Sequence, residues 1–217
     1  MQRNGSEEVD NLLFHPFRLQ PDYPGDQYQI DGSQVKIPFF NEEERPDLLI
    51  IIALIDVFSK KIVGYTLTKS ETFRSYFDVI SQSVTETKCL PAELLSDNLP
   101  AFNSKESKNY QEKLKALGVL IRKHKSLNPS DKSAIKNWFG IFNQHYLKDV
   151  PGFLGDGIKS RNKDGKPNSD LTRDYRKIKN LRTRSELKEL LRERKLLSTI
   201  RLMKLKTQPP IYYTCTR

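Results

Sequence analysis

The stretch from Leu48 to Thr68, LLIIIALIDVFSKKIVGYTLT, decides the fold of this chain of 217 residues. Its first ten residues form a nearly continuous apolar run rich in isoleucine, which is typical of a central strand buried on both faces. The next four residues, FSKK, predict a tight turn, and the alternating pattern after them predicts a second strand. When two strands are joined by such a short turn, they pair in the antiparallel direction. The stretch therefore predicts a hairpin at the centre of a sheet.

The flanking segments extend this hairpin into a larger sheet. Residues 27–40, QYQIDGSQVKIPFF, alternate between apolar and polar positions and predict one strand or two short ones before the hairpin. From residue 72 to about residue 147, helical spacing and short apolar runs alternate, which predicts three helices and two further strands. The order β-β-β-α-β-α-β-α predicts an α/β fold with a mixed five-stranded sheet and helices on both faces.

The composition divides the chain into three parts. Residues 1–26 are polar and rich in turn signals, which predicts an extended lead-in, and residues 27–158 hold the predicted core. Residues 159–217 form a basic arm, in which the segment 159–206 has 17 Lys and Arg against 6 Asp and Glu. A capping box at Thr183-Arg-Ser-Glu186 predicts that one or two helices lie within 171–206. Such an arm would attract DNA, although a solvated helix exposing its lysines has the same composition.

Several classes of protein are not expected. The longest apolar run is far shorter than the ~20 residues that span a bilayer, and the N-terminus lacks the apolar core of a signal peptide. We therefore expect a cytoplasmic, intracellular protein with no membrane partner. Cys89 and Cys215 belong to no CxxC pair and are expected to be free thiols. The three histidines show no metal-ligand spacing with each other or with the cysteines, so zinc is not expected.

Two aspartates stand where a metal site could form. Asp31 lies in the first predicted strand, and Asp97 ends the fourth. Rigidly held carboxylates that lie close together suit a hard cation such as Mg²⁺, and a pair of such ions can catalyse phosphodiester chemistry. A single Asp at a strand end is more often a turn or cap residue. Asp56, in the turn sequence DVFSKK, fits that ordinary role.

A longer pattern includes both aspartates. It consists of four segments in a fixed order, which are QIDGSQV (29–35), IIALIDVFSKKIVGYTLTKSET (51–72), SDNLPAF (96–102) and KSAIKNWFGIFNQHYL (132–147). Together they resemble the catalytic core that retroviral integrases and bacterial transposases share. The segment DVPGFLGDGI (149–158) is similar to one that follows this core in the bacteriophage Mu transposase and bacterial insertion-sequence group. That group is the one the chain resembles most.

The resemblance implies an RNase H-like fold and a bacterial mobile element whose enzyme cleaves DNA and transfers strands during integration or transposition. It also implies an Asp-Asp-Glu set that binds Mg²⁺ or Mn²⁺. Asp31 and Asp97 match the two aspartates, and Lys136 stands where the family has its Glu. A lysine offers three donors and no acceptor, so it cannot bind the metal. We expect Lys136 to pair with both aspartates instead, and strand transfer to be abolished or severely reduced.

DNA is the partner that this resemblance implies. Basic residues near the loop before the last core helix, and others in the arm, are candidates for contacts with phosphates. They are Arg122, Lys123, Lys125, Arg173, Arg176, Lys177 and Arg182. A homo-oligomer is also expected, because relatives act as multimers. Two alternatives stay open, namely a non-catalytic DNA-binding or assembly module that keeps the fold and a weakened RNase H-like nuclease.

Overall fold

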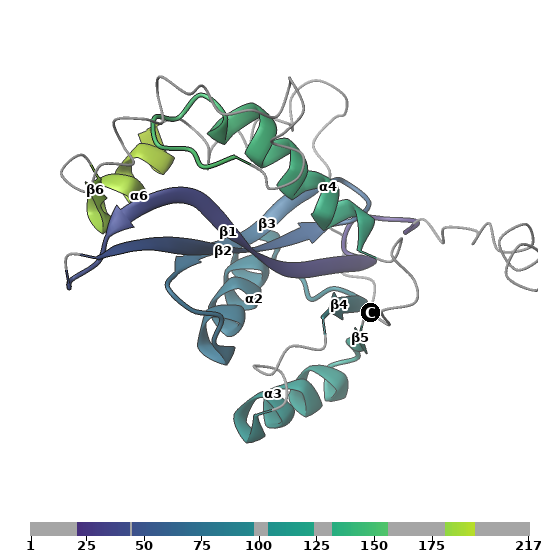
Figure 1. Ribbon diagram of the computed structural model, residues 1–217. Coiled ribbons are helices and arrows are strands. Elements are labelled where there is room, and N and C mark those ends of the chain that lie inside the picture. The colour runs from purple at the N-terminus through teal and green to yellow at the C-terminus, as the bar shows by residue number, and fades with distance from the viewer. Residues whose placement is uncertain (1–20, 44, 98–103, 124–131, 156–180, 194–217) are drawn as a thin grey trace, which may run out of the picture.

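A computed structural model describes residues 21–43, 45–97, 104–123, 132–155 and 181–193 (Figure 1). Its sheet has the order β3-β2-β1-β4-β5, with a short sixth strand, β6, beside β1. The strands are β1 (Gln27–Phe40), β2 (Pro46–Asp56), β3 (Lys61–Thr68), β4 (Glu93–Ser96), β5 (Leu120–Lys123) and β6 (Arg182–Thr183). The first three strands are antiparallel, whereas β4 runs parallel to β1 and β5 parallel to β4. The predicted mixed sheet is confirmed.

The central hairpin forms as the sequence predicts. In β2, Ile51, Ala53 and Ile55 enter one core cluster, while Ile52 and Leu54 enter the other. A strand that faces two cores needs apolar residues at every position, which explains its unbroken apolar run. The segment before it is a single long strand, β1, whose register against β2 shifts between residues 34 and 38. On either side of this shift, the same strand pairs with the two ends of β2.

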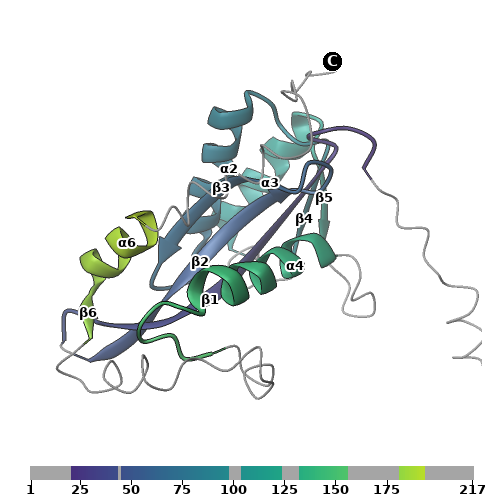
Figure 2. The same cartoon turned by 90° about the horizontal axis from the view of Figure 1, so that it is seen from above.

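Helices cover both faces of the sheet (Figure 1; Figure 2). Two helices, α2 (Phe73–Thr87) and α3 (Lys105–Ala116), lie on one face. On the other lie α4 (Ser133–Ile141), its π-helical continuation η2 (Phe142–Leu147), and α6 (Arg184–Glu193). Side chains of β1 and β2 form a separate apolar cluster with each set. The sheet is therefore the middle of three layers, with helices packed on either side.

The helix boundaries follow the local signals. The Thr72 side chain accepts a hydrogen bond from the Ser75 backbone N–H and caps α2. Helix α3 ends just before Gly118. The φ of Gly118 is 89°, the left-handed conformation that glycine commonly adopts after a helix. The helix predicted up to Leu147 is instead α-helical only as far as Ile141, and it widens into the π-helix η2.

The start of the basic arm packs against the core. Thr183 and Glu186 form the predicted capping box, with Thr183 N–H donating to the Glu186 carboxylate at 2.7 Å. Leu187 and Leu191 of α6 are buried in the same cluster as Phe39 of β1. The parallel pairing of β6 with the end of β1 reinforces this contact. The rest of the helical region expected over 171–206 lies outside the described residues.

Two further expectations can be compared with the structure. Cys89 is disulfide-bonded, so the expectation of a free thiol there is wrong. The sequence showed no local signal for this, because neither cysteine belongs to a recognisable spacing motif. Within the described ranges, none of the helices has the length and apolar character needed to cross a bilayer.

The contact between β3 and α2 depends on Gly64. A Cβ at Gly64 would lie 2.4 Å from the carbonyl oxygen of Val79, a backbone atom that cannot move aside cheaply. We expect Gly64→Ala to lower the free energy of unfolding by about 2–3 kcal/mol through overpacking. Urea denaturation measures this free energy.

Gly140→Ala in α4 is the control. No atom lies within 4 Å of the position of its added Cβ, and we expect the free energy of unfolding to rise by about 0.5–1 kcal/mol. Equal effects at both sites would contradict this account.

Candidate active site

Asp31 and Asp97 lie at one edge of the sheet because of the way β1 and β4 pair. The two strands pair in parallel only up to Gln29 and Leu95. Each aspartate lies two residues beyond this last pair, so both carboxylates are on the same face where the strands diverge. The Asp31 side chain is 15% exposed and that of Asp97 is 35% exposed. The pair is thus held by the sheet and open to solvent on one side.

A lysine ammonium bridges the two carboxylates. Lys132 Nζ lies 3.0 Å from Asp31 Oδ1 and 2.9 Å from Asp97 Oδ2. The Lys132 side chain is fully buried, and its residue is the N-cap of α4. Helix α4 packs on this face of the sheet through Ile135, whose N–H donates to the Gln29 side chain at 3.2 Å. That packing directs the first turn of α4 at the acid pair.

The lysine expected in this ion pair was a different one. Lys136 was expected to pair with the aspartates, but Lys132 does so, and the Lys136 side chain is exposed. The two residues are one helical turn apart, and the Lys136 N–H donates to the Lys132 carbonyl oxygen at 3.1 Å. The sequence resemblance did not indicate which of the two lysines reaches the acid pair.

The Lys132 ammonium offsets the burial of Asp31 only in part. Burial raises the pKa of Asp31 above its ordinary value, although Lys132 pulls that pKa down and Asp97 raises it further. A carboxylate in this position gains from any added cation. Oxygen ligands converging on a cationic atom fit Mg²⁺ or Mn²⁺ chemically. In the part of the chain that the structure describes, however, no third His, Cys, Asp or Glu joins them as a metal-binding group.

A third carboxylate, Glu71, lies near the site on the opposite face of the sheet. The Tyr76 hydroxyl donates to Glu71 Oε2 at 3.2 Å, and Glu71 Oε1 lies 2.3 Å from where a Cβ of Gly32 would be. Burial raises the pKa of Tyr76, and the charges of Glu71, Asp31 and Asp97 raise it further. The sequence analysis missed Glu71. A glycine inside a strand next to Asp31 was the available signal, because such glycines often mark a close approach.

Asp56 has the ordinary structural role that its turn sequence indicated. Its carboxylate is fully buried and accepts hydrogen bonds from the backbone N–H groups of Gly25, Phe58 and Ser59. The Ser59 hydroxyl donates to it as well. Burial raises the pKa of Asp56 despite these donors. The residue therefore fixes the β2–β3 turn and the segment before β1, and it takes no part in the acid pair.

The expected DNA contacts are placed only in part. Lys123 lies opposite Ser96 in the β4–β5 pairing, at the same edge as Asp97, and is exposed. Arg122, one residue earlier, forms an ion pair with Glu93. Arg182 donates to the Pro151 carbonyl oxygen at 3.0 Å and thereby ties β6 to the core. Four of the expected contacts lie outside the described residues, and they are Lys125, Arg173, Arg176 and Lys177.

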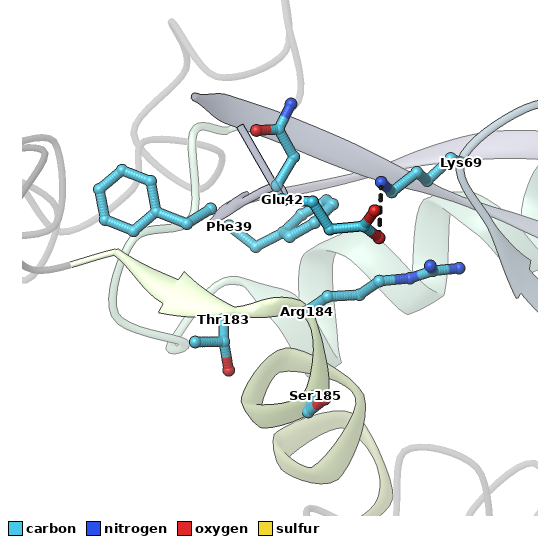
Figure 3. Close-up of a pocket in the computed structure, with 8 residues that line it drawn as sticks. Phe39, Glu42, Lys69, Thr183, Arg184 and Ser185 are labelled. Atoms are coloured by element: carbon cyan, nitrogen blue, oxygen red, sulfur yellow. Dashed lines mark hydrogen bonds and ion pairs between the residues drawn. The ribbon is translucent and has the colours of Figure 1, made fainter. Parts of the chain in front are cut away.

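A groove of about 730 Å³ lies at the other end of the sheet (Figure 3). Phe39 is part of its lining, eight residues beyond Asp31 on β1, a separation of roughly 26 Å along a strand. In it, Lys69 Nζ lies 3.4 Å from Glu42 Oε1, and Arg184 and Ser185 at the start of α6 form the facing wall (Figure 3). The groove is therefore separate from the acid pair.

The mixed sheet with helices on both faces is the arrangement of an RNase H-like integrase core. The integrase core domain family matches residues 21–129, half of the chain, and this match includes both aspartates. The chain belongs to the integrase core domain family. The matched region ends before α4, so it covers neither Lys132 nor Lys136.

Solved structures of viral integrases resemble the chain at low identity. The simian T-cell lymphotropic virus intasome in complex with the PP2A regulatory subunit B56 gamma is 22% identical, with a TM-score of 0.45. The match covers 55% of this chain and 39% of that one, so the chain spans well under half the length of that viral protein. The magnesium-bound, dimeric HTLV-2 integrase catalytic core domain is 19% identical, with a TM-score of 0.43 and coverage of 56% and 70%. No curated protein matches the chain.

Proposed function

We propose that this chain is the catalytic core of a transposase or integrase of a mobile element, closest to the Mu and bacterial insertion-sequence group. It acts on DNA, cleaving strands and joining their ends, with Mg²⁺ or Mn²⁺ held by Asp31 and Asp97. The observation that supports this is the convergence of the two carboxylates, on one face of one sheet edge, within 3.0 Å of a single cationic atom. Two acids so placed suit the metal that phosphodiester chemistry requires.

The residues around the pair have distinct parts in this proposal. Asp31 and Asp97 would hold the cation, which would supply activation of the attacking oxygen and stabilisation of the leaving one. Exposed Lys123, at the same edge, binds a DNA phosphate and positions the strand. Lys136 stands at the third acidic position, where it supplies no ligand for the metal. We also propose that copies of the chain assemble on paired DNA ends.

The charge at residue 136 provides the test of this function. We expect Lys136→Glu to increase the joining of a pre-cleaved DNA end, in Mg²⁺ or Mn²⁺, by at least about tenfold, equivalent to about 1.4 kcal/mol of the barrier. The reason is that a carboxylate there adds a metal ligand next to the acid pair. Product formation on a labelled DNA end measures the effect, with Asp97→Asn as the inactive reference.

Lys136→Gln is the matched control for that experiment, because it removes the ammonium without adding a carboxylate. If Gln and Glu raise joining equally, repulsion by Lys136 limits the reaction and a third ligand does not. If Lys136→Glu yields no joining although folding and DNA affinity are unchanged, the impairment proposed for residue 136 is refuted. That result would favour a second candidate, a non-catalytic DNA-binding module, which the neutralising contact of Lys132 with both acids also favours.

A further inference from the structure

Lys132 occupies the point where the two carboxylates meet. Its Nζ lies 3.0 Å from Asp31 and 2.9 Å from Asp97, and the side chain is fully buried. Among the described residues, Nζ has no partner besides these two carboxylates. A buried lysine with no neutral acceptor depends on its two carboxylates for both counter-charge and hydrogen bonding. Its position is therefore set by the acid pair and not by a wider hydrogen-bond network.

A cation that bridges both aspartates needs the same space. Divalent Mg²⁺ binds carboxylate oxygens at about 2.0–2.1 Å, so a bridging ion would lie between the oxygens that Nζ now contacts. The ammonium and such an ion would also repel each other strongly at this distance in a partly buried site. An ion bound to Asp31 Oδ1 and Asp97 Oδ2 would therefore compete with the ammonium for the same position.

We propose that Lys132 is the built-in counter-ion of the acid pair and that a divalent cation binds only when this ammonium leaves. With Lys132 in place, the two carboxylates and the ammonium have a net charge of −1. When Lys132 leaves, the net charge is −2, which one divalent cation neutralises. In this exchange of the ammonium for a metal ion, Lys132 affects the metal affinity as much as the aspartates do. The choice of a divalent metal rests on the proposed function, whereas the ion pairs are observed in the structure.

Helix α4 supplies its own matched control. Lys136 lies one turn after Lys132 on the same helix, has the same charge and is exposed. A long-range effect of positive charge on the aspartates would come from both lysines. Occupation of the bridging position belongs to Lys132 alone.

The test measures Mn²⁺ binding to the full chain without DNA, by electron paramagnetic resonance of the free ion. We expect Lys132→Met to bind Mn²⁺ at least about tenfold more tightly than the unsubstituted chain. Lys136→Met should change the affinity less than about threefold, as expected for an exposed and screened charge. Equal gains from both variants, or no gain from Lys132→Met, would overturn the proposal. Circular dichroism and Lys132→Gln, which retains a polar end, check that the result does not come from misfolding.

A second measurement uses the unsubstituted chain and so does not depend on a variant that folds. Acetylation by an amine-reactive reagent, read by mass spectrometry, should leave Lys132 largely unlabelled without metal, because it is buried and ion-paired. Saturating Mn²⁺ should raise its labelling several-fold while the labelling of Lys136 stays constant. Protection of Lys132 that persists in saturating Mn²⁺ would refute the exchange.

The outcomes for the exchange and for the proposed function can be told apart. A Lys132→Met chain that binds Mn²⁺ tightly but joins no DNA, even with a carboxylate at position 136, would leave the exchange standing and count against the proposed function. A chain that joins DNA while Lys132 stays protected in Mn²⁺ would do the reverse.

Discussion

Replacement of Asp31 by asparagine should lower the free energy of unfolding by about 1.5–3 kcal/mol, which is large for one isosteric change. The loss comes from Lys132, whose buried ammonium would lose the more buried of its two carboxylates, the one that is only 15% exposed. Lys132 would keep Asp97, which is 35% exposed, as its one charged partner, so less attraction would offset the burial of the ammonium. Urea denaturation in the presence of a chelator measures the change without interference from bound metal.

The raised pKa of Asp31 predicts how this loss can be reversed. Burial raises that pKa more than Lys132 lowers it, so the ion pair only partly offsets the cost of burying both charges. An apolar replacement of the lysine should therefore compensate for the loss of the acid. We expect the double variant Asp31→Asn, Lys132→Met to have a free energy of unfolding within about 1 kcal/mol of that of the unsubstituted chain. The coupling energy between the two positions should then be at least about 1 kcal/mol.

The control for this cycle is again Lys136. Asp31→Asn combined with Lys136→Met should show a coupling below about 0.5 kcal/mol, because Lys136 is exposed and exposed charges interact weakly. Additive effects for Asp31 and Lys132 would mean that the ion pair contributes nothing measurable. Strong coupling with Lys136 instead would show that the wrong lysine has been assigned to the bridge.

The sequence predicted those parts of the fold that local patterns encode. An unbroken apolar run predicted β2, a short polar turn predicted the hairpin, and a capping box predicted the start of α6. Each of these signals spans fewer than about a dozen residues and reflects backbone hydrogen bonding or burial. The short strand β6 had no such signal. Its two residues pair with the end of β1, which lies some 140 positions earlier in the chain.

The candidate site was predictable for a similar reason, and only in part. Asp31 and Asp97 follow paired segments of neighbouring parallel strands, so their convergence follows from the topology. The topology does not determine which lysine pairs with them. A lysine side chain has four methylene groups, so it can reach a carboxylate from more than one backbone position. Lys132 lies at the N-cap, where the chain enters α4, and its side chain extends inward. No periodic pattern distinguishes it from Lys136, since residues four apart share a helix face.

The two lysines limit the proposed reaction in different ways, so their combined replacement should have the largest effect on activity. Lys132→Met removes the cation that occupies the acid pair, and Lys136→Glu supplies the missing ligand one turn further along α4. Either change alone leaves the other obstacle in place. We expect the double variant to join a pre-cleaved DNA end at least about a hundredfold faster than the unsubstituted chain, equivalent to about 2.7 kcal/mol of the barrier.

The size of the gain relative to the single variants distinguishes the possible causes. If a free acid pair and a third carboxylate are needed together, the gain exceeds the product of the two single gains, because residues that act as one unit are not additive. End joining in Mn²⁺, compared at equal DNA occupancy, measures this. Lys132→Met combined with Lys136→Gln is the control that lacks only the new carboxylate. A double variant no faster than the better single variant would show that only one of the two lysines restrains the site.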